Sequence, residues 1–280
     1  MRLFAIFAWL FAFAAQPAWA ASSPRLQSLE QQLAYLVGSR SGSVGVAALD
    51  LRTGEYVSVR GDEPFPMAST MKIAVAANYL AQVEHGRRSL DDRIAGRSAH
   101  ALMEAMIIRS DNHATDLLLR DLGGPKVLQS WLDQHGMSGI RIDRNIAQLL
   151  SARRDLYDVR DSSTPRAMVD LLARIDSGKL IDGGSRAYLL DLMRRCQTGK
   201  NRIRGLLPYG AQVENKTGTL ANYSTDVGFL TLPDGRRLAV AFFARGGADR
   251  PRTIAEAART IYDGFAAMLR APFYSPVGGQ

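Results

Sequence analysis

The chain has 280 residues, of which 46% are hydrophobic and 22% are charged. This composition is typical of a globular protein with one large domain or two closely packed subdomains. The net charge is +8, but the positive residues are scattered, and no basic run with interleaved aromatic residues predicts a nucleic-acid surface. The single cysteine, Cys196, excludes an intramolecular disulfide, and we expect it to be a buried thiol.

Residues 1–20 have the pattern of a secretory signal peptide. Arg2 supplies a positive start, residues 3–15 are apolar, and Ala18-Trp19-Ala20 is a typical cleavage site. An uncleaved anchor is the alternative. Later in the sequence there is no apolar run of about 18 residues, the length that a spanning helix needs. We therefore expect a periplasmic protein that leaves the membrane after cleavage.

The mature chain shows strand patterns near both ends and helical patterns between them. Apolar residues at helical spacing predict a first helix that Gly38 closes, and alternating residues with turn signals predict the strands. Residues 139–164 lack periodicity and are predicted to form a long ordered loop. Helices are expected over 26–38, 69–83, 101–108, 113–122, 185–195 and 253–269 and from Pro125 and Pro165, and strands over 44–51, 56–59, 211–216, 226–232 and 237–245.

This order of elements predicts an α/β fold. Strands from the two ends of the chain form one antiparallel sheet, flanked by the N- and C-terminal helices, with an all-α subdomain inserted between them. The expected boundaries are residues 21–64 and 208–280 for the α/β subdomain and residues 65–207 for the all-α subdomain.

Three short motifs in this chain contain residue types that can take part in nucleophilic catalysis. Because residues three apart share a helix face, the hydroxyl of Ser69 and the amine of Lys72 can meet, and a desolvated lysine can activate a serine nucleophile. Each motif alone also has a structural explanation: a helix start, a helix cap or a strand end. The motifs, in order, are Ser69-Thr70-Met71-Lys72, Ser110-Asp111-Asn112 and Lys216-Thr217-Gly218.

Together the three motifs resemble the set found in class A β-lactamases and penicillin-binding proteins. Similarity to class A β-lactamases extends along nearly all of the mature chain, from the Phe65 segment to the approach to Lys216. The resemblance implies a β-lactamase/transpeptidase-like fold with the site between the subdomains, and it implies no metal and no cofactor.

The resemblance also assigns roles to residues of this chain. Ser69 would attack a lactam or peptide carbonyl, and the backbone N–H groups of Ser69 and Thr219 would bind the developing oxyanion. The catalytic residues would be Ser69, Lys72, Ser110 and Lys216. The substrate-binding residues would be Asn112, Thr217, Gly218 and Thr219.

The sequence departs from the family in its omega loop. The family carries a glutamate there that activates the deacylating water, and an asparagine four residues later. In this chain the two positions hold Ile146 and Leu150, and residues 139–165 contain no glutamate. Arg144 and Asp161 can still form the ion pair at the neck of the loop, which is slightly longer than the family's. The nearby Asp155 or Asp158 is the alternative base, and without any base the acyl-enzyme should persist.

Two further departures affect the cleft. The stretch between the first two motifs is shorter than in the family, which predicts a more open cleft. Thr225 stands where many relatives place a carboxylate-binding arginine, and Arg250 or Arg252 could compensate. His113 follows the second motif, and we expect it to be a structural or solvated histidine. The alternative is that it binds a metal ion that activates a water molecule.

Three functions remain open from the sequence. The first is a periplasmic serine β-lactamase that acylates through Ser69 and deacylates slowly or by an unusual route. The second is a DD-peptidase-like acyltransferase that acts on peptidoglycan peptides. The third is a non-hydrolytic sensor of β-lactams or muropeptides. All three take a small-molecule substrate, a β-lactam or a D-alanyl peptide, and we expect a monomer.

Overall fold

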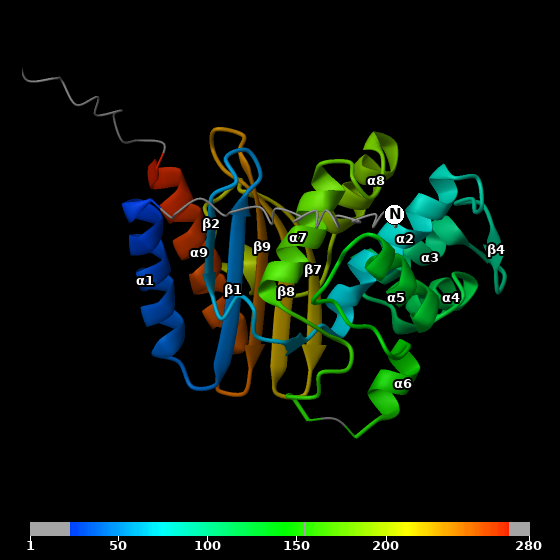
Figure 1. Cartoon of the computed structure of the whole chain (residues 1–280), viewed down its shortest axis with the longest axis horizontal. Coiled ribbons are helices and arrows are strands. Elements are labelled where there is room, and N and C mark those ends of the chain that lie inside the picture. Colours follow the sequence, from blue (N-terminus) through cyan, green and yellow to red (C-terminus); the bar gives the residue numbers. More distant parts are fainter. Residues whose placement is uncertain (1–22, 154, 269–280) are drawn as a thin grey trace, which may run out of the picture.

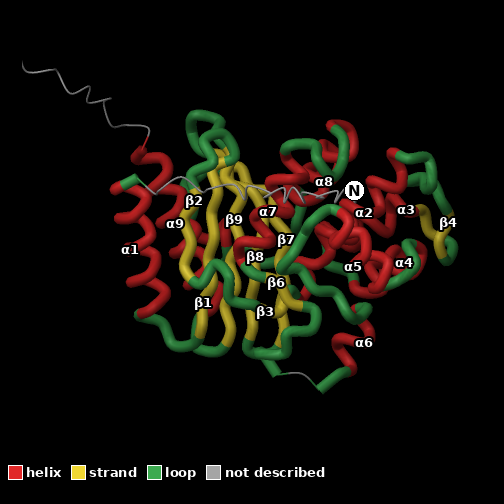
Figure 2. The backbone as a smooth tube through the Cα atoms, viewed as in Figure 1, coloured by secondary structure: helices red, strands yellow, loops and turns green. Residues whose placement is uncertain are grey.

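The computed structural model describes residues 23–153 and 155–268, so the predicted signal peptide lies outside the described residues. The chain forms a central sheet with helices on both faces, and a group of further helices lies beside one edge of that sheet (Figures 1 and 2). Within the described residues, none of the helices is long and apolar enough to cross a membrane.

The sheet is antiparallel, and its strands come from both ends of the chain. Because β1 pairs with β9, the N-terminal hairpin joins the C-terminal strands in the order β2-β1-β9-β8-β7. The predicted α/β architecture is confirmed. The strands are β1 (Ser43–Asp50), β2 (Tyr56–Val59), β7 (Gln212–Leu220), β8 (Tyr223–Thr231) and β9 (Arg237–Arg245).

Helices bury both faces of this sheet. The terminal helices α1 (Pro24–Gly38) and α9 (Arg250–Met268) pack on one face, and α7 (Pro165–Asp176) packs on the other. Side chains alternate between two apolar clusters, so that Val240 and Phe242 of β9 face the terminal helices while Ala239 and Phe243 face α7. The strands are therefore buried on both sides, which fixes their register firmly.

The helical group is built around α2 (Lys72–Glu84). Residues 72–81 of this helix are all buried, and several of them are alanines that allow neighbouring helices to approach closely. The helices that contact α2 are α3 (Ala99–Ile108), α4 (Asn112–Asp121), α5 (Pro125–Gln134) and α8 (Gly183–Arg194). Between α2 and α3 lies a small hairpin of β4 (Arg93–Ile94) and β5 (Arg97–Ser98).

The predicted long ordered loop over residues 139–164 contains regular elements that the sequence analysis missed. This stretch contains helix α6 (Ile146–Ser151) and strand β6 (Ser162–Ser163), which pairs with β3 (Phe65–Pro66). Helix α6 is too short to show a helical period, although its capping box of Asn145 and Gln148 is a recognisable start signal. The segment is therefore tied to the chain that leads into Ser69.

A second correction concerns the strand that carries Lys216. We predicted that it ends at Lys216, but β7 continues to Leu220 and pairs with β8 throughout, because Thr217 and Thr219 suit a strand despite the glycine between them. As the last strand in the sheet order, β7 has one backbone edge outside the ladder. The third motif therefore lies along an open strand edge instead of at a strand end.

Candidate active site

Ser69 lies in a short 3-10 helix, η1 (Ala68–Met71), immediately before α2. Ala68 adopts a positive φ of 48°, an unusual conformation for a residue with a side chain. The segment is held by its surroundings: Met67 N–H donates to the Asp161 carbonyl at 3.0 Å, and the Tyr223 hydroxyl donates to the Pro66 carbonyl. Within the described residues the Ser69 hydroxyl has no hydrogen-bond partner, so it is free to react with a ligand.

Lys72 is completely buried, and its amine is surrounded by oxygen atoms from the second motif. Lys72 Nζ donates to the Ser110 carbonyl at 2.7 Å, to Ser110 Oγ at 3.3 Å and to Asn112 Oδ1 at 2.8 Å. Burial, followed by the charge of Lys216, lowers the pKa of Lys72 to about 7. A large share of the amine is therefore neutral near neutral pH, as a general base requires.

The second motif connects α3 to α4. One of its side chains caps α4, and the other two contact buried lysines. Asp111 is the N-cap of α4 and accepts from Ala114 N–H at 2.6 Å, so the capping explanation holds for this residue. Ser110 has a positive φ of 60°, and its hydroxyl, like the amide of Asn112, faces the buried lysines. The strained backbone at Ser110 accompanies this orientation.

Lys216, on β7, is also completely buried. Its Nζ donates to Ser110 Oγ at 2.8 Å and to the Thr217 carbonyl at 2.8 Å, and burial lowers its pKa to about 8. The Ser110 hydroxyl consequently contacts both lysine amines. Such an arrangement can pass a proton from one amine to a leaving group through the hydroxyl.

Gly218 explains how β7 comes close to Ser69. A side chain at this position would lie 2.9 Å from Ala68 Cβ and 2.9 Å from the Met67 carbonyl oxygen. Only glycine allows the strand edge to pack directly on η1. Strand β7 thus packs against η1, and the Thr217 hydroxyl is hydrogen-bonded to Thr198 Oγ1 at 2.5 Å.

Arg202 is a residue of this region that sequence reasoning missed. Its side chain is largely buried, and its guanidinium donates to the Gly218 and Thr225 carbonyls at 2.8 Å each and to Thr219 Oγ1 at 2.6 Å. It thus places a positive charge beside the third motif. The contact is long-range and joins the segment before β7 to the strand itself, so no local pattern predicted it.

Arg250 and Arg252, which the sequence offered as replacements for an arginine at Thr225 or as plain surface residues, have other partners. Arg250 donates to the Gly246 carbonyl at 3.3 Å, and Arg252 forms an ion pair with Glu256 on α9 at 3.0 Å. The Thr225 side chain itself donates to the Phe242 carbonyl within the sheet. Arg202 is the better candidate for the cation at this place.

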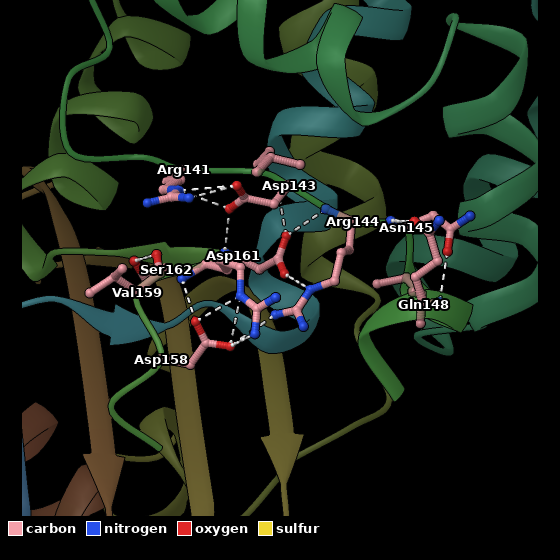
Figure 3. A network of polar contacts seen from close by, with 12 residues as sticks. Arg141, Asp143, Arg144, Asn145, Gln148, Asp158, Val159, Asp161 and Ser162 are labelled. Atoms are coloured by element: carbon pink, nitrogen blue, oxygen red, sulfur yellow. Dashed lines mark hydrogen bonds and ion pairs between the residues drawn. The ribbon is translucent and has the colours of Figure 1, made fainter. Parts of the chain in front are cut away.

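The neck of the omega loop is closed by the predicted ion pair (Figure 3). Arg144 Nε lies 2.6 Å from Asp161 Oδ2, and Asp161 Oδ1 accepts the backbone N–H groups of Asp143 and Arg144. Arg144 also reaches Asp158, whose carboxylate accepts from Arg160 as well. The hydrogen bonds from Arg160 hold the pKa of Asp158 well below its usual range, which makes Asp158 a poor base.

Ile146 occupies the first turn of α6, and its side chain is only 3% exposed within the main apolar core. Leu150, one turn later, is 58% exposed. Asp155 lies farther along the loop, is exposed, and accepts from Tyr157 N–H at 2.8 Å. By the resemblance, the position of the family's glutamate is thus held by Ile146, a buried apolar residue.

We predict that Arg144→Ala destabilises the protein by about 3–5 kcal/mol, because it leaves the fully buried charge of Asp161 without its partner. Urea unfolding measures this loss. The matched control is Arg141→Ala, which removes an exposed ion pair with Asp143 in the same network and should change little. Equal stabilities of the two variants would contradict a structural role for the neck.

Within residues 23–153 and 155–268, no cluster of three or more His, Cys, Asp or Glu side chains could hold a metal ion. His113 is an exposed residue on α4. A metal-assisted water therefore gains no support from the geometry of the described residues.

Comparisons with known proteins decide the family. The model of the "Beta-lactamase enzyme family" matches residues 28–265. The carbapenem-hydrolysing β-lactamase KPC of Klebsiella oxytoca is 33% identical over 248 residues, which cover 80% of this chain and 84% of that protein. The chain belongs to the class A serine β-lactamase family.

Other relatives of this class A family member agree. The extended-spectrum β-lactamase PER-1 of Pseudomonas aeruginosa is 28% identical over 267 residues, covering 84% of this chain and 86% of the relative. The structure of the class A β-lactamase of the last common ancestor of Gram-negative bacteria superposes with a TM-score of 0.80 at 35% identity, covering 85% of this chain and 99% of that one. The class A fold and a serine β-lactamase-type hydrolase are thus established.

Proposed function

We propose that this hydrolase opens β-lactam rings through an acyl-enzyme on Ser69. The observation that carries the proposal is that two buried lysines, Lys72 at the start of α2 and Lys216 on β7, both contact the Ser110 hydroxyl. Ser69 is the one motif hydroxyl left without a protein partner in the described residues. The family provides the substrate class, and these contacts support the roles of the individual residues.

Acylation is proposed to proceed in the following steps. Neutral Lys72 accepts the proton of Ser69 as Oγ attacks the lactam carbonyl carbon, and the N–H groups of Ser69 and Thr219 bind the oxyanion. As the tetrahedral intermediate collapses, the C–N bond breaks and Ser110 donates its proton to the lactam nitrogen. Ser110 regains a proton from the lysine ammonium groups that contact it. The ring-opened product stays attached to Ser69 as an ester.

Deacylation is proposed to be slow or to follow an unusual route, because buried, apolar Ile146 cannot activate water. The same observation favours a second candidate, a DD-peptidase-like acyltransferase that acts on peptidoglycan peptides. A non-hydrolytic sensor that signals through the acylated state is the third. In each case acylation of Ser69 comes first.

Arg202 is proposed to bind the substrate carboxylate together with Thr217 and Thr219. Arg202→Met should raise KM for a penicillin by about 10- to 100-fold, the loss expected for a charge-assisted hydrogen bond. Steady-state kinetics with benzylpenicillin and its methyl ester measure this, and the ester should be affected much less. Arg252→Met is the matched control, because its ion pair lies on α9. An equal loss for acid and ester would exclude carboxylate binding.

We infer that the protein acts in the periplasm as a monomer. The location rests on the predicted signal peptide of residues 1–20, which supports export. Small-angle scattering of the exported protein would test the oligomeric state, and fractionation of cells that express the whole chain would test the location.

A chromogenic cephalosporin assay combined with intact-protein mass spectrometry tests the proposed function. Rapid turnover without adduct supports efficient hydrolysis, and slow turnover with a persistent adduct supports the slow route. An adduct without turnover favours the acyltransferase or the sensor, which a D-alanyl peptide substrate then separates. If no β-lactam or D-alanyl substrate gives turnover or adduct, the proposal fails.

A further inference from the structure

Asp226, on β8, is a completely buried carboxylate that the proposed acylation steps do not use. It lies directly opposite Thr217 of the third motif in the β7–β8 ladder, so the two side chains point to the same face of the sheet. Asp226 Oδ2 accepts from Ile203 N–H at 3.2 Å, and Oδ1 accepts from Asn215 Nδ2 at 2.8 Å. Burial raises the pKa of Asp226 to about 6, so the group is mostly ionised at neutral pH.

These two hydrogen bonds fix the chain that follows Arg202. Ile203 is the next residue, and its side chain is buried in the apolar cluster that faces the terminal helices. Arg204 Nε donates to Asn215 Oδ1 at 3.0 Å, so Asn215 joins Arg204 to Asp226. One buried polar pair, Asp226 and Asn215, therefore ties both residues after Arg202 to the β7–β8 strands.

The head of the Arg202 side chain is held by the same two strands. Its terminal nitrogens donate to the Gly218 and Thr225 carbonyls and to Thr219 Oγ1. Burial lowers the pKa of Arg202, and the negative charge of Asp226 acts against this loss. The guanidinium and the backbone after it are thus anchored to two adjacent residues of β8, Thr225 and Asp226.

The position of the Asp226 charge sets it apart from a carboxylate that serves only the fold. Asp50, which is equally buried, forms a direct ion pair with Arg236 at 2.6 Å. Asp226 has no such ion pair among the described residues, and the cations that stabilise its charge are Arg202 and Lys216 of the site. A buried charge without a direct partner costs stability, so its place beside these cations indicates a role in the site.

We propose that Asp226 is a positioning residue that holds Arg202 where its guanidinium binds the substrate carboxylate. The proposal rests on the proposed function, in which Arg202 binds that carboxylate. Asp226 touches no substrate atom and acts through the Ile203 N–H, which fixes the backbone on which Arg202 is carried. Because a small misplacement of a binding group can cost a large part of its effect, loss of this anchor should weaken recognition of the carboxylate.

The test is Asp226→Asn, whose amide offers one acceptor oxygen to two donors, the Ile203 N–H and the Asn215 amide. Rapid-quench mass spectrometry gives the second-order rate constants for acylation by benzylpenicillin and by its methyl ester. We expect the ratio of acid to ester to fall about tenfold, because the ester has no carboxylate for Arg202 to bind. A general loss of packing would slow both substrates alike and leave this ratio unchanged.

The matched control is Asp50→Asn. It removes another fully buried carboxylate that accepts two backbone N–H groups, those of Arg52 at 2.9 Å and Thr53 at 3.1 Å. Asp50 accepts at the turn between β1 and β2, so this variant should keep the wild-type ratio of acid to ester even where it loses stability.

Two combined variants test whether the effect passes through the hydrogen bonds and through Arg202. Asn215→Asp together with Asp226→Asn keeps every hydrogen bond, because the new amide donates to the new carboxylate and its oxygen accepts from Ile203 N–H. The ratio should return to within about twofold of the wild-type value. In an Arg202→Met background, Asp226→Asn should not lower the ratio further, since two changes that act through one group are not additive.

A wild-type ratio in Asp226→Asn, no recovery in the exchanged pair, a further loss in the Arg202→Met background or an equal loss in Asp50→Asn would overturn the proposal. If Asp226→Asn does not fold, Asp226→Ala removes both acceptor oxygens without adding a donor and gives the same test. A wild-type ratio in Arg202→Met would instead refute carboxylate binding by Arg202. A wild-type protein that forms no adduct and shows no turnover would refute the proposed function itself, which is a separate result.

Discussion

Replacement of Ser69 by alanine is expected to abolish both the covalent adduct and β-lactam turnover. The variant lacks the only atom that can form the ester, so hydrolysis should fall by at least about 1,000-fold, which corresponds to roughly 4 kcal/mol of lost transition-state stabilisation. The hydroxyl makes no hydrogen bond to the described residues, so the fold should lose little. Intact-protein mass spectrometry and steady-state kinetics provide the two measurements.

The control for this variant is Ser28→Ala, an exposed serine on α1. It should react with β-lactams like the wild-type protein. Turnover retained in Ser69→Ala would mean that another group performs the attack, and the assignment of the nucleophile would then be wrong.

The second large effect is expected for Lys72→Met, which keeps most of the buried volume but removes the amine. Acylation should slow by about 100- to 10,000-fold, the range of general acid–base catalysis. In the wild-type protein the acylation rate should rise as the pH increases through about 7, because the pKa of Lys72 is lowered to that value and only the neutral amine accepts a proton. Below that pH the ammonium form predominates and acylation declines.

Stopped-flow acylation between about pH 5 and pH 9 measures this profile. Lys179→Met, which removes an exposed lysine after α7, should keep the wild-type profile. Because Lys72 donates hydrogen bonds to Ser110 and Asn112, circular dichroism must show that the Lys72 variant is folded. A folded Lys72→Met variant that acylates at the wild-type rate would exclude this lysine as the base.

Much of the fold could be predicted because its patterns are local. Alternating apolar residues defined β2 and β9 at their observed bounds, and proline at the first turn marked the starts of α5 and α7. Helix α6 was missed because six residues do not establish a period. The end of β7 was misplaced because glycine at position 218 resembles a strand end, whereas it is required for contact with η1.

The residues of the site that belong to the three motifs could be predicted from the sequence. Each motif names residues that are adjacent in the sequence, and the structure places the lysine of the first motif, the serine of the second and the lysine of the third in hydrogen-bond contact. Arg202 belongs to no motif. Its contacts depend on how the segment before β7 folds back onto that strand, which periodicity and spacing do not encode.

The central claim is that β-lactams acylate Ser69 and that the acyl-enzyme is then hydrolysed slowly or by an unusual route. Wild-type protein mixed with benzylpenicillin, quenched in acid at successive times, digested and mapped by mass spectrometry tests it most directly. We predict that the peptide containing Ser69 gains the mass of the intact penicillin before the penicilloate product accumulates. An adduct on any other residue, or penicillin hydrolysis that persists in Ser69→Ala, would contradict the account.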